Sequence, residues 1–173
     1  DKEYTAEGLV KWITKTVKNA EKALSFVVEE KIDGASIVLY YKNGKLDSAV
    51  TRGNGLVGND VTENVRTIMS VPLVTSVQSD FAVRGEIFIE KGDFETYNKA
   101  FDNRYSNPRN LAAGSMRNIK SSVAARVPMK IFTYEGYFED DTHNGHVLTL
   151  SRMAGENFPI DLNMGYFTDD PET

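Results

Sequence analysis

Hydrophobic residues near the start of the chain recur with the period of a helix. Thr5 is a residue type that often caps a helix N-terminus, and it stands just before this pattern. We therefore predict a helix over residues 5–21, within an N-terminal segment of residues 1–22. The apolar residues on its predicted inner side are Leu9, Val10, Ile13, Val17 and Ala20.

Beyond residue 24 the apolar residues come in short runs rich in Val, Ile, Leu, Phe and Tyr, which is typical of strands. Asn43-Gly44 joins two of these runs and is a strong signal for a two-residue hairpin turn. Hairpins mixed with helices, without regular strand–helix alternation, predict an α+β fold with a largely antiparallel sheet. The predicted strands are 25–30, 36–42, 46–51, 81–90 and 129–138, and the predicted later helices are 91–101, 107–118 and 148–157.

Composition narrows the class of protein. With 173 residues, 40% of them hydrophobic and 26% charged, the chain has the values of one globular domain. No apolar run approaches the roughly 20 residues that a membrane-spanning helix needs, so we expect no membrane association. The lack of cysteine excludes disulfides and thiolate metal sites and suits a cytoplasmic protein. Since the first residue is Asp1 and not Met, we expect a fragment or a processed chain.

The two histidines do not suggest a metal site. His143 and His146 stand in a polar stretch beside Asn144-Gly145, without carboxylate or cysteine partners at ligand spacing. We interpret both as surface loop residues, and the sequence predicts no set of protein metal ligands.

Charge is unevenly distributed along the chain. A net charge of −5 argues against a strong nucleic-acid binder. However, no Asp or Glu occurs between Asn103 and Tyr134. From charge alone, a solvated basic face and a local track for phosphate groups are equally good interpretations of this stretch. Its basic residues are Arg104, Arg109, Arg117, Lys120, Arg126 and Lys130.

The first stretch whose residues are suited to catalysis or binding is Glu29-Glu30-Lys31-Ile32-Asp33-Gly34, between two predicted strands. A lysine becomes a nucleophile when desolvation or neighbouring cations lower its pKa, and a glycine lets the backbone pass close to a ligand. A K-x-D-G pattern alone is weak, because it occurs by accident in roughly one chain of this length in thirty. The alternative is a surface turn.

The second stretch is glycine-rich and follows a predicted strand. It reads Thr51-Arg52-Gly53-Asn54-Gly55, then G-N-D-V-T and N-V-R-T-I over residues 58–62 and 64–68. Closely spaced glycines allow backbone amides to approach phosphate or ribose, and Arg52 favours anion binding. Asp60 or Thr62 would cap a short helix. The alternative is a flexible hairpin loop.

Arg84-Gly85-Glu86 lies inside an apolar strand, with its two charged residues on the same face. If that face is buried, a structural ion pair is the expected role. If it lines a cleft, Glu86 is suited to holding ribose hydroxyls or a metal-bound water. The sequence leaves both open.

The fourth stretch runs from Asn107 to Arg117 and reads N-P-R-N-L-A-A-G-S-M-R. Its small residues permit close approach of another backbone, and the forked donors of Arg109 and Arg117 suit phosphate groups. The alternative is a tightly packed helix with two exposed arginines.

In this order, the four stretches resemble the adenylation domain of bacterial NAD-dependent DNA ligases. K-I-D-G resembles the lysine-adenylation motif, and T-R-G-N-G, R-G-E and N-P-R-N-L-A-A-G-S-M-R resemble the motifs that follow it. The resemblance covers residues 26–138. The last motif and N-V-R-T-I are not features of ATP-dependent ligases or capping enzymes.

The resemblance implies a nucleotidyltransferase fold with antiparallel sheets and flanking short helices, and a reaction that uses NAD and Mg²⁺. Lys31 would attack the α-phosphate of NAD, release nicotinamide mononucleotide and form a phosphoramidate to AMP, with Asp33 supporting the lysine. AMP would then pass to the 5′-phosphate of a nick in duplex DNA, and the 3′-hydroxyl would displace it. These steps belong to DNA replication and to the repair of DNA damage.

The same resemblance implies binding roles for other residues. Glu29 and Ile32 would contact the adenine, at its polar edge and on its ring face. Arg52 and Glu86 would line the phosphate and ribose of AMP. Arg109 and Arg117 would contact the DNA backbone around the nick, and we expect the protein to act as a monomer.

The chain also departs from the family pattern. Asn54 and Asn59 stand where the family usually carries acidic residues. Nothing beyond residue 138 resembles the family's D-G-hydrophobic-K block and later lysine strand, and the N-terminal segment does not resemble its nicotinamide mononucleotide pocket. We therefore expect a single partial domain over 1–173 with a motif-bearing core at 25–138. The alternatives are a degenerate paralogue that binds nucleotide or DNA without catalysis, and an RNA ligase or capping-type enzyme that uses ATP or GTP.

Overall fold

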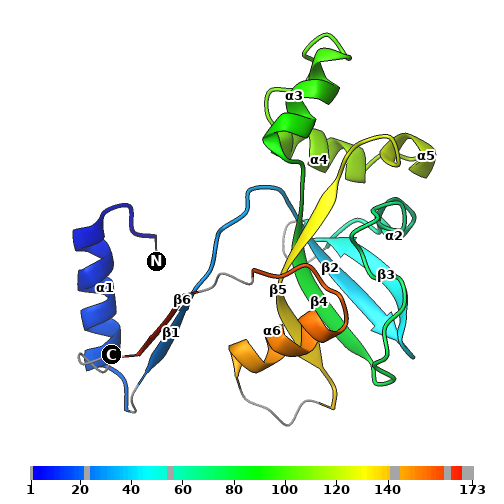
Figure 1. Cartoon of the computed structure of the whole chain (residues 1–173). Coiled ribbons are helices and arrows are strands. Elements are labelled where there is room, and N and C mark those ends of the chain that lie inside the picture. The colour runs from blue at the N-terminus through cyan, green and yellow to red at the C-terminus, as the bar shows by residue number, and fades with distance from the viewer. Residues whose placement is uncertain (1, 22–23, 54–56, 141–144, 162–164, 169–173) are drawn as a thin grey trace. The chain divides into compact units, whose positions relative to one another are not determined.

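The computed structural model describes the chain except residues 1, 22–23, 54–56, 141–144, 162–164 and 169–173. Its helices and antiparallel strands confirm the predicted α+β class (Figure 1). The chain forms two compact units, Asp1–Glu30 with Leu162–Thr173, and Lys31–Asp161. One domain can contain two compact units, so the single partial domain over 1–173 stays a prediction.

The first unit contains helix α1 (Ala6–Lys18) and the paired strands β1 (Ser25–Val28) and β6 (Gly165–Thr168). As predicted, the Thr5 side chain caps α1 and accepts a hydrogen bond from the Gly8 amide at 3.1 Å. The helix ends earlier than predicted because Asn19 forms its C-cap. Strand β1 is also shorter than predicted, and β6 was not predicted because four residues show no periodicity.

The second unit is built on a four-stranded antiparallel sheet in the order β3-β2-β4-β5. The strands are β2 (Ala35–Lys42), β3 (Lys45–Thr51), β4 (Phe81–Phe88) and β5 (Lys130–Phe138). Asn43 and Gly44 join β2 to β3 with φ angles of 47° and 71°. Two consecutive positive φ values are characteristic of a type I′ hairpin turn, so the predicted turn is confirmed.

The core lies on one face of this sheet. The rings of Tyr41, Phe81 and Phe138 stack with centroid distances of 4.6 and 4.9 Å, and Phe158 packs edge-on against Tyr41 at 5.4 Å. Helix α6 (His146–Gly155) packs against β5. Residues 36, 38 and 40 alternate with the buried residues 37, 39 and 41 of β2, so their side chains occupy the opposite face.

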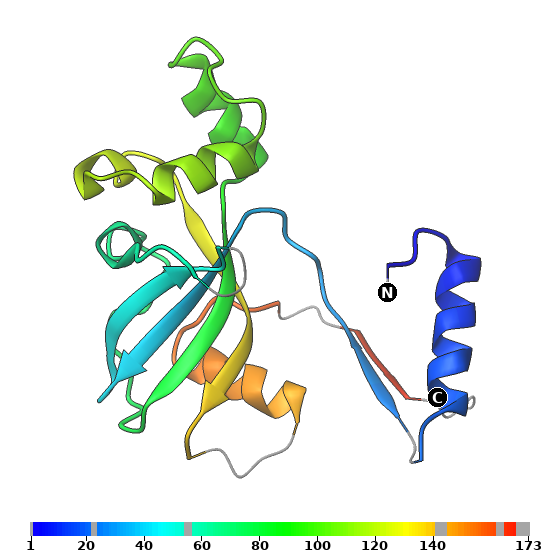
Figure 2. The same cartoon turned by 180° about the vertical axis from the view of Figure 1, so that it is seen from behind.

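Four further helices belong to the second unit: α2 (Thr62–Val65), α3 (Lys91–Lys99), α4 (Pro108–Met116) and α5 (Ser121–Ala124). Figure 2 shows α3, α4 and α5 beyond one end of the sheet. Asn107 caps α4 by accepting a hydrogen bond from the Asn110 amide at 2.8 Å, and Pro108 takes the first helical position. Helix α5 was not predicted, because four residues are too few to show a helical period. Among the described helices, none is both long and apolar enough to cross a bilayer.

Gly34 allows the chain entering β2 to pass directly against β4. A Cβ atom at this position would lie 2.2 Å from the carbonyl oxygen of Ile87 and 3.0 Å from Cγ of Glu86. No side chain fits at the first distance unless the backbone of one strand moves. The absence of a side chain at Gly34 therefore fixes how closely the segment that carries Lys31 approaches Glu86.

We predict that Gly34→Ala lowers the free energy of unfolding by about 1–3 kcal/mol, the usual cost of overpacking a well-packed site. Gly92 is the matched control, because a Cβ atom there meets no atom within 4 Å and Gly92 lies in α3. Gly92→Ala should leave stability unchanged or raise it slightly, since alanine favours a helix by about 0.5–1 kcal/mol over glycine. Urea unfolding measures both. Equal stability of the two variants would contradict the packing argument.

Candidate active site

A cavity of about 680 Å³ opens beside the sheet of the second unit. We call it the lysine cavity. Its volume lies in the range typical of ligand pockets, about 300–1,000 Å³. All four motif stretches contribute to its wall, although they are far apart in the sequence. Of the predicted site residues, those that line it are Lys31, Asp33, Arg52, Glu86, Arg109 and Arg117.

Two predicted adenine contacts are not among the lining residues. Ile32 is half-buried next to Lys31 but does not line the cavity. Glu29 is half-buried in the other compact unit, so its contact with adenine stays a prediction. Asn59 lines the cavity, whereas Asn54 lies outside the described residues.

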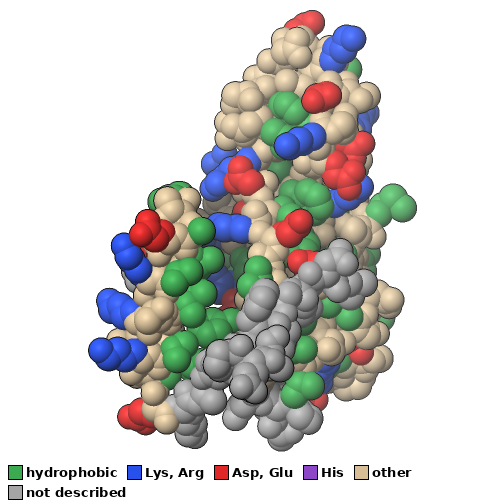
Figure 3. Space-filling model, turned by 60° about the vertical axis from the view of Figure 1, so that its left-hand side comes forward, with side chains coloured by type: hydrophobic (Ala, Val, Ile, Leu, Met, Phe, Trp, Pro, Cys, Tyr) green, Lys and Arg blue, Asp and Glu red, His purple; other side chains and the backbone are tan. Residues whose placement is uncertain are grey.

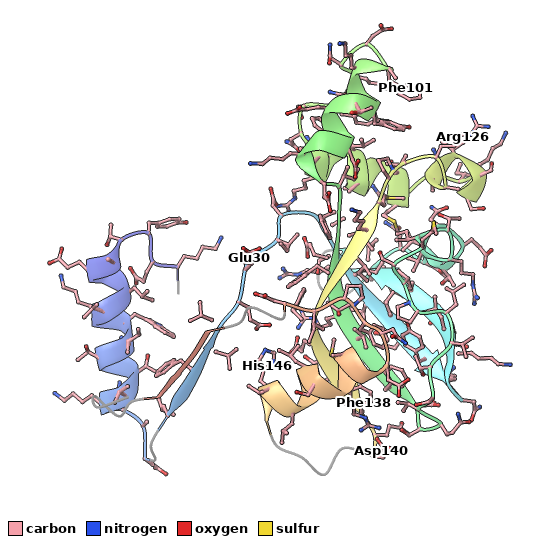
Figure 4. The ribbon with its side chains drawn as sticks, viewed as in Figure 1. Glu30, Phe101, Arg126, Phe138, Asp140 and His146 are labelled. Carbon is pink, nitrogen blue, oxygen red and sulfur yellow. The ribbon has the colours of Figure 1, made fainter. Side chains whose placement is uncertain are left out.

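The interpretation of the histidines needs one correction. His146 is exposed, as expected, but it is the first residue of α6 and not part of a loop (Figure 4). The helix begins two positions before its predicted start because Gly145, in extended conformation, takes the cap position. His143 lies outside the described residues.

The carboxyl of Glu86 lies in a mixed electrostatic environment. Burial raises the pKa of this carboxyl above its usual value, and the negative charge of Asp33 adds to the effect. The positive charges of Lys31 and Arg109 and a hydrogen bond from the Gly34 amide act in the opposite direction. Lys31, Gly34 and Glu86 therefore form one interacting group, although Lys31 and Glu86 come from different sequence motifs.

Arg109 is held in the lysine cavity by an ion pair with Asp33. Its Nη1 lies 2.9 Å from Oδ1 of Asp33, and both side chains are largely exposed, at 60% and 76%. An ion pair this exposed contributes little to stability, so its main consequence is the position of the guanidinium. A phosphate group can therefore replace Asp33 as the partner of the Arg109 guanidinium.

Arg84 and Glu86 are both half-buried and both line the lysine cavity, so the face that carries them borders a cleft; Arg84 in addition forms an ion pair, with Glu135 and not with Glu86. Nη1 of Arg84 donates to Oε2 of Glu135 at 2.7 Å across the β4–β5 pair, which is a structural ion pair. Glu86 lies two residues further along β4, on the same face of the sheet, and also lines the cavity. Tyr134 and Ser36 also line the cavity, with their hydroxyl oxygens 3.5 Å apart.

Sequence reasoning missed Ser36, Tyr134 and Glu135. The signal that could have found them is the strand period. Ser36 pairs in register with Glu86, and Glu135 with Arg84. Their face of the sheet follows once the register is known, but no local motif marks them.

Helix α2 begins directly after the glycine-rich stretch, and the side chain of Asp60 stabilises its first turn. The Asp60 carboxylate accepts hydrogen bonds from the backbone amide of Thr62 at 2.9 Å and from its hydroxyl at 2.6 Å. These bonds hold the pKa of Asp60 below its usual value. Of the two predicted caps, Asp60 supplies the side-chain oxygen, while Val61 occupies the N-cap position of α2.

In the acid-free stretch, residues 103–134, some of the basic side chains already have acidic partners and are not free to bind phosphate. Arg109 is paired with Asp33, and Nζ of Lys130 lies 2.6 Å from Oε1 of Glu90. On the face of the molecule that Figure 3 shows, basic and acidic side chains are interspersed over the upper part. Arg126 is exposed and points away from the ribbon (Figure 4). Within the acid-free stretch, the other exposed cations without an acidic partner in the described ion pairs are Arg104, Arg117 and Lys120.

We predict that Glu86→Gln removes the contribution that titration of this carboxyl makes to the pH dependence of the free energy of unfolding. A raised folded-state pKa means that Glu86 contributes stability below its unfolded pKa, near 4.5, and that this contribution is lost as pH rises through the folded pKa. The variant lacks this loss. Its unfolding free energy relative to the unaltered chain should therefore increase between about pH 4 and about pH 7.

Urea unfolding at both pH values measures this difference. Glu95→Gln is the matched control, because Glu95 is exposed on α3 and its replacement measures only the loss of a surface carboxyl. A difference for Glu86→Gln that falls with rising pH would show that the carboxyl is stabilised, and not destabilised, in its charged form.

Comparison with known proteins agrees with this arrangement of motifs. Residues 1–172 match the family described as NAD-dependent DNA ligase adenylation domain. The chain is 41% identical over 165 residues to a DNA ligase of Leptospira interrogans, covering 94% of the chain and 24% of that protein. It is 49% identical over 140 residues to a DNA ligase of Borrelia hermsii, covering 78% of the chain and 21% of that protein.

The chain thus spans about a quarter of the length of these curated relatives, 24% and 21%. The match extends over both compact units and beyond the stretch in which the motifs were found. The resemblance predicted from the motifs is confirmed: the chain belongs to the family of NAD-dependent DNA ligase adenylation domains.

Proposed function

We propose that this chain transfers AMP from NAD to Lys31, the first step of nick sealing in duplex DNA. Nζ of Lys31, in its neutral form, attacks the α-phosphorus of NAD. A phosphorus–nitrogen bond forms, the bond from that phosphorus to the bridging oxygen breaks, and nicotinamide mononucleotide leaves with the oxygen. The nitrogen loses a proton and the adenylated lysine remains.

The observation that carries this proposal is the convergence of Lys31, Glu86, Arg52 and Arg109 on one cavity. Phosphoryl transfer needs little covalent chemistry from the protein beyond the nucleophile, and it depends on positioning and on neutralising charge. Arg52 and Arg109 supply positive charge for the phosphates. Glu86 supplies a carboxylate for the ribose hydroxyls.

The side chains also fit the Mg²⁺ that we expect in this reaction. Within the described part of the chain, no group of three or more His, Cys, Asp or Glu residues is placed to hold a metal ion. Mg²⁺ commonly binds through one or two carboxylates together with substrate phosphates and water. Glu86 is the cavity carboxylate suited to holding a Mg²⁺-bound water, and the ion would neutralise phosphate charge.

For the later steps we propose that AMP passes from Lys31 to the 5′-phosphate of the nick and is displaced by the 3′-hydroxyl. Arg117 lies at the end of α4 and lines the lysine cavity, where a DNA phosphate would meet the adenylated lysine. Arg109, released from Asp33, would bind a second phosphate. A monomeric state and a cytoplasmic location are also part of this proposal.

We predict that Lys31→Ala abolishes adenylation, because no other group supplies the phosphoramidate nitrogen. Incubation of the chain with NAD and Mg²⁺, followed by intact-mass measurement, should show one added AMP in the unaltered chain and none in Lys31→Ala. Lys45→Ala is the control, since Lys45 is exposed at the far end of the β2–β3 hairpin. AMP on Lys31→Ala would refute the site. Adenylation by ATP in place of NAD would support the triphosphate-using alternative.

We predict that Arg117→Ala separates DNA binding from adenylation, whereas Arg109→Ala impairs both. Each should weaken binding to a nicked duplex and reduce the slope of log affinity against log salt by about 0.9, the value for one lost phosphate contact. Arg117→Ala should leave adenylation intact, whereas Arg109→Ala should slow it because Arg109 faces Lys31 and Asp33 in the lysine cavity. Lys42→Ala, at the far hairpin end, controls for net charge. An unchanged salt slope in Arg117→Ala would contradict its role.

A further inference from the structure

Ile119 is an apolar side chain that the fold holds entirely in solvent. It stands between α4 and α5 with its whole side chain accessible, at 100% exposure. Its neighbours Arg117 and Lys120 are both exposed cations. Single exposed apolar residues are common on protein surfaces, so exposure alone carries no conclusion.

The backbone on both sides of Ile119 is, however, held by hydrogen bonds, of which the one to Met116 is buried. Nδ2 of Asn64, a residue only 6% exposed, donates to the carbonyl oxygens of Met116 at 2.7 Å and of Asn118 at 2.8 Å. The Asn118 side chain then accepts from the Lys120 amide at 3.0 Å. A buried amide side chain from α2 therefore holds the segment that presents Ile119, and the side chain projects from a rigid base.

The position of Ile119 relates it to the lysine cavity. A second cavity of about 740 Å³, lined by Ile119, lies beside α2. It shares Asn59, Met116 and Arg117 with the lysine cavity, so the two cavities are adjacent. Ile119 thus stands on the rim of a groove next to the cavity that contains Lys31.

The charges around this groove limit what contacts Ile119. The wall formed by β3, α2 and the residues between them carries Asp47, Asp60 and Glu63. Lys42 pairs with Asp47 at 3.2 Å and Arg66 with Glu63 at 3.5 Å, which leaves Asp60 without a basic partner in the described ion pairs. The rim formed by the α4–α5 segment carries Arg117 and Lys120. Phosphate groups are therefore favoured along the α4–α5 rim and disfavoured against the opposite wall.

We propose that Ile119 packs against the sugar and base edges of duplex DNA in the minor groove, while Arg117 and Lys120 hold the phosphates on either side. Proteins that bind the minor groove frequently insert apolar side chains, isoleucine among them, at base steps, and use basic or amide side chains for the other contacts. An apolar side chain on a hydrogen-bonded backbone segment, flanked by two cations, matches a partner whose apolar sugars alternate with phosphates. Because the groove adjoins the lysine cavity, the contacted sugars belong to the duplex next to the nick.

This inference rests on the proposed function, because it takes nicked DNA as the partner. It adds a positioning residue that no sequence motif marked. Ile119 transfers no group. Its contact would set the register of the duplex relative to the adenylated lysine.

Binding of a fluorescent nicked duplex to the chain, measured by anisotropy over a series of salt concentrations, tests the inference. Ile119→Ala should weaken binding about fivefold to tenfold, the effect of losing the apolar area of most of an isoleucine side chain, without changing the salt slope. Lys120→Ala should instead reduce the salt slope by about 0.9. Ile119→Leu should retain the affinity. Val74→Ala is the matched control, because Val74 is a β-branched residue, 69% exposed, beside the far end of the hairpin.

Equal affinity of Ile119→Ala and Val74→Ala would overturn the inference, as would an unaltered chain that binds no duplex. A change in the sedimentation of Ile119→Ala alone, with unchanged affinity for DNA, would assign the side chain to a protein contact and also overturn it. Adenylation of Lys31 by NAD is measured separately by mass. Failure of that reaction contradicts the proposed function, whereas its success with unaltered DNA binding in Ile119→Ala contradicts only the inference.

Discussion

The close approach of two backbones at Gly34 determines the geometry of the site. A Cβ atom there would lie 2.2 Å from the carbonyl oxygen of Ile87, so only glycine permits this packing. The approach brings the segment that carries Lys31 and Asp33 next to Glu86 of β4. Asp33 in turn holds Arg109 of α4, at 2.9 Å. The proposed nucleophile, a carboxylate and the cation proposed to bind phosphate thereby line one cavity, although they come from three separate parts of the sequence.

The charges of the lysine cavity are balanced in a way that suits the arrival of phosphates. Burial penalises the charged form of Glu86, and Lys31 and Arg109 offset part of that penalty. Asp33 holds Arg109 through an exposed ion pair, which costs little to exchange for a pair with phosphate. Asp33 thus keeps the Arg109 guanidinium in place, and preorganised charge of this kind would lower the barrier to the phosphoryl transfer that we propose.

The strands, the hairpin and most helices could be predicted because periodicity and turn chemistry are local properties. Helix α5 and strand β6 could not, since each has four residues. The site followed a similar division. Lys31, Glu86 and Arg109 were marked by motifs, but the Asp33–Arg109 pair joins residues far apart in sequence and depends on tertiary packing. Glu135 and the hydrogen bonds from Asn64 to the α4–α5 segment were missed for the same reason, because strand register and helix packing decide those partners.

A structure of the chain with bound NAD or AMP would show whether the packing at Gly34 builds one nucleotide site around Lys31. We expect the AMP phosphorus to lie at Nζ of Lys31, with the ribose near Glu86 and the phosphate facing Arg52 or Arg109. Nucleotide bound in the neighbouring cavity beside α2, among Asp60, Arg66 and Ile119, would contradict this expectation, as would a nucleotide that leaves Lys31 and Glu86 uncontacted.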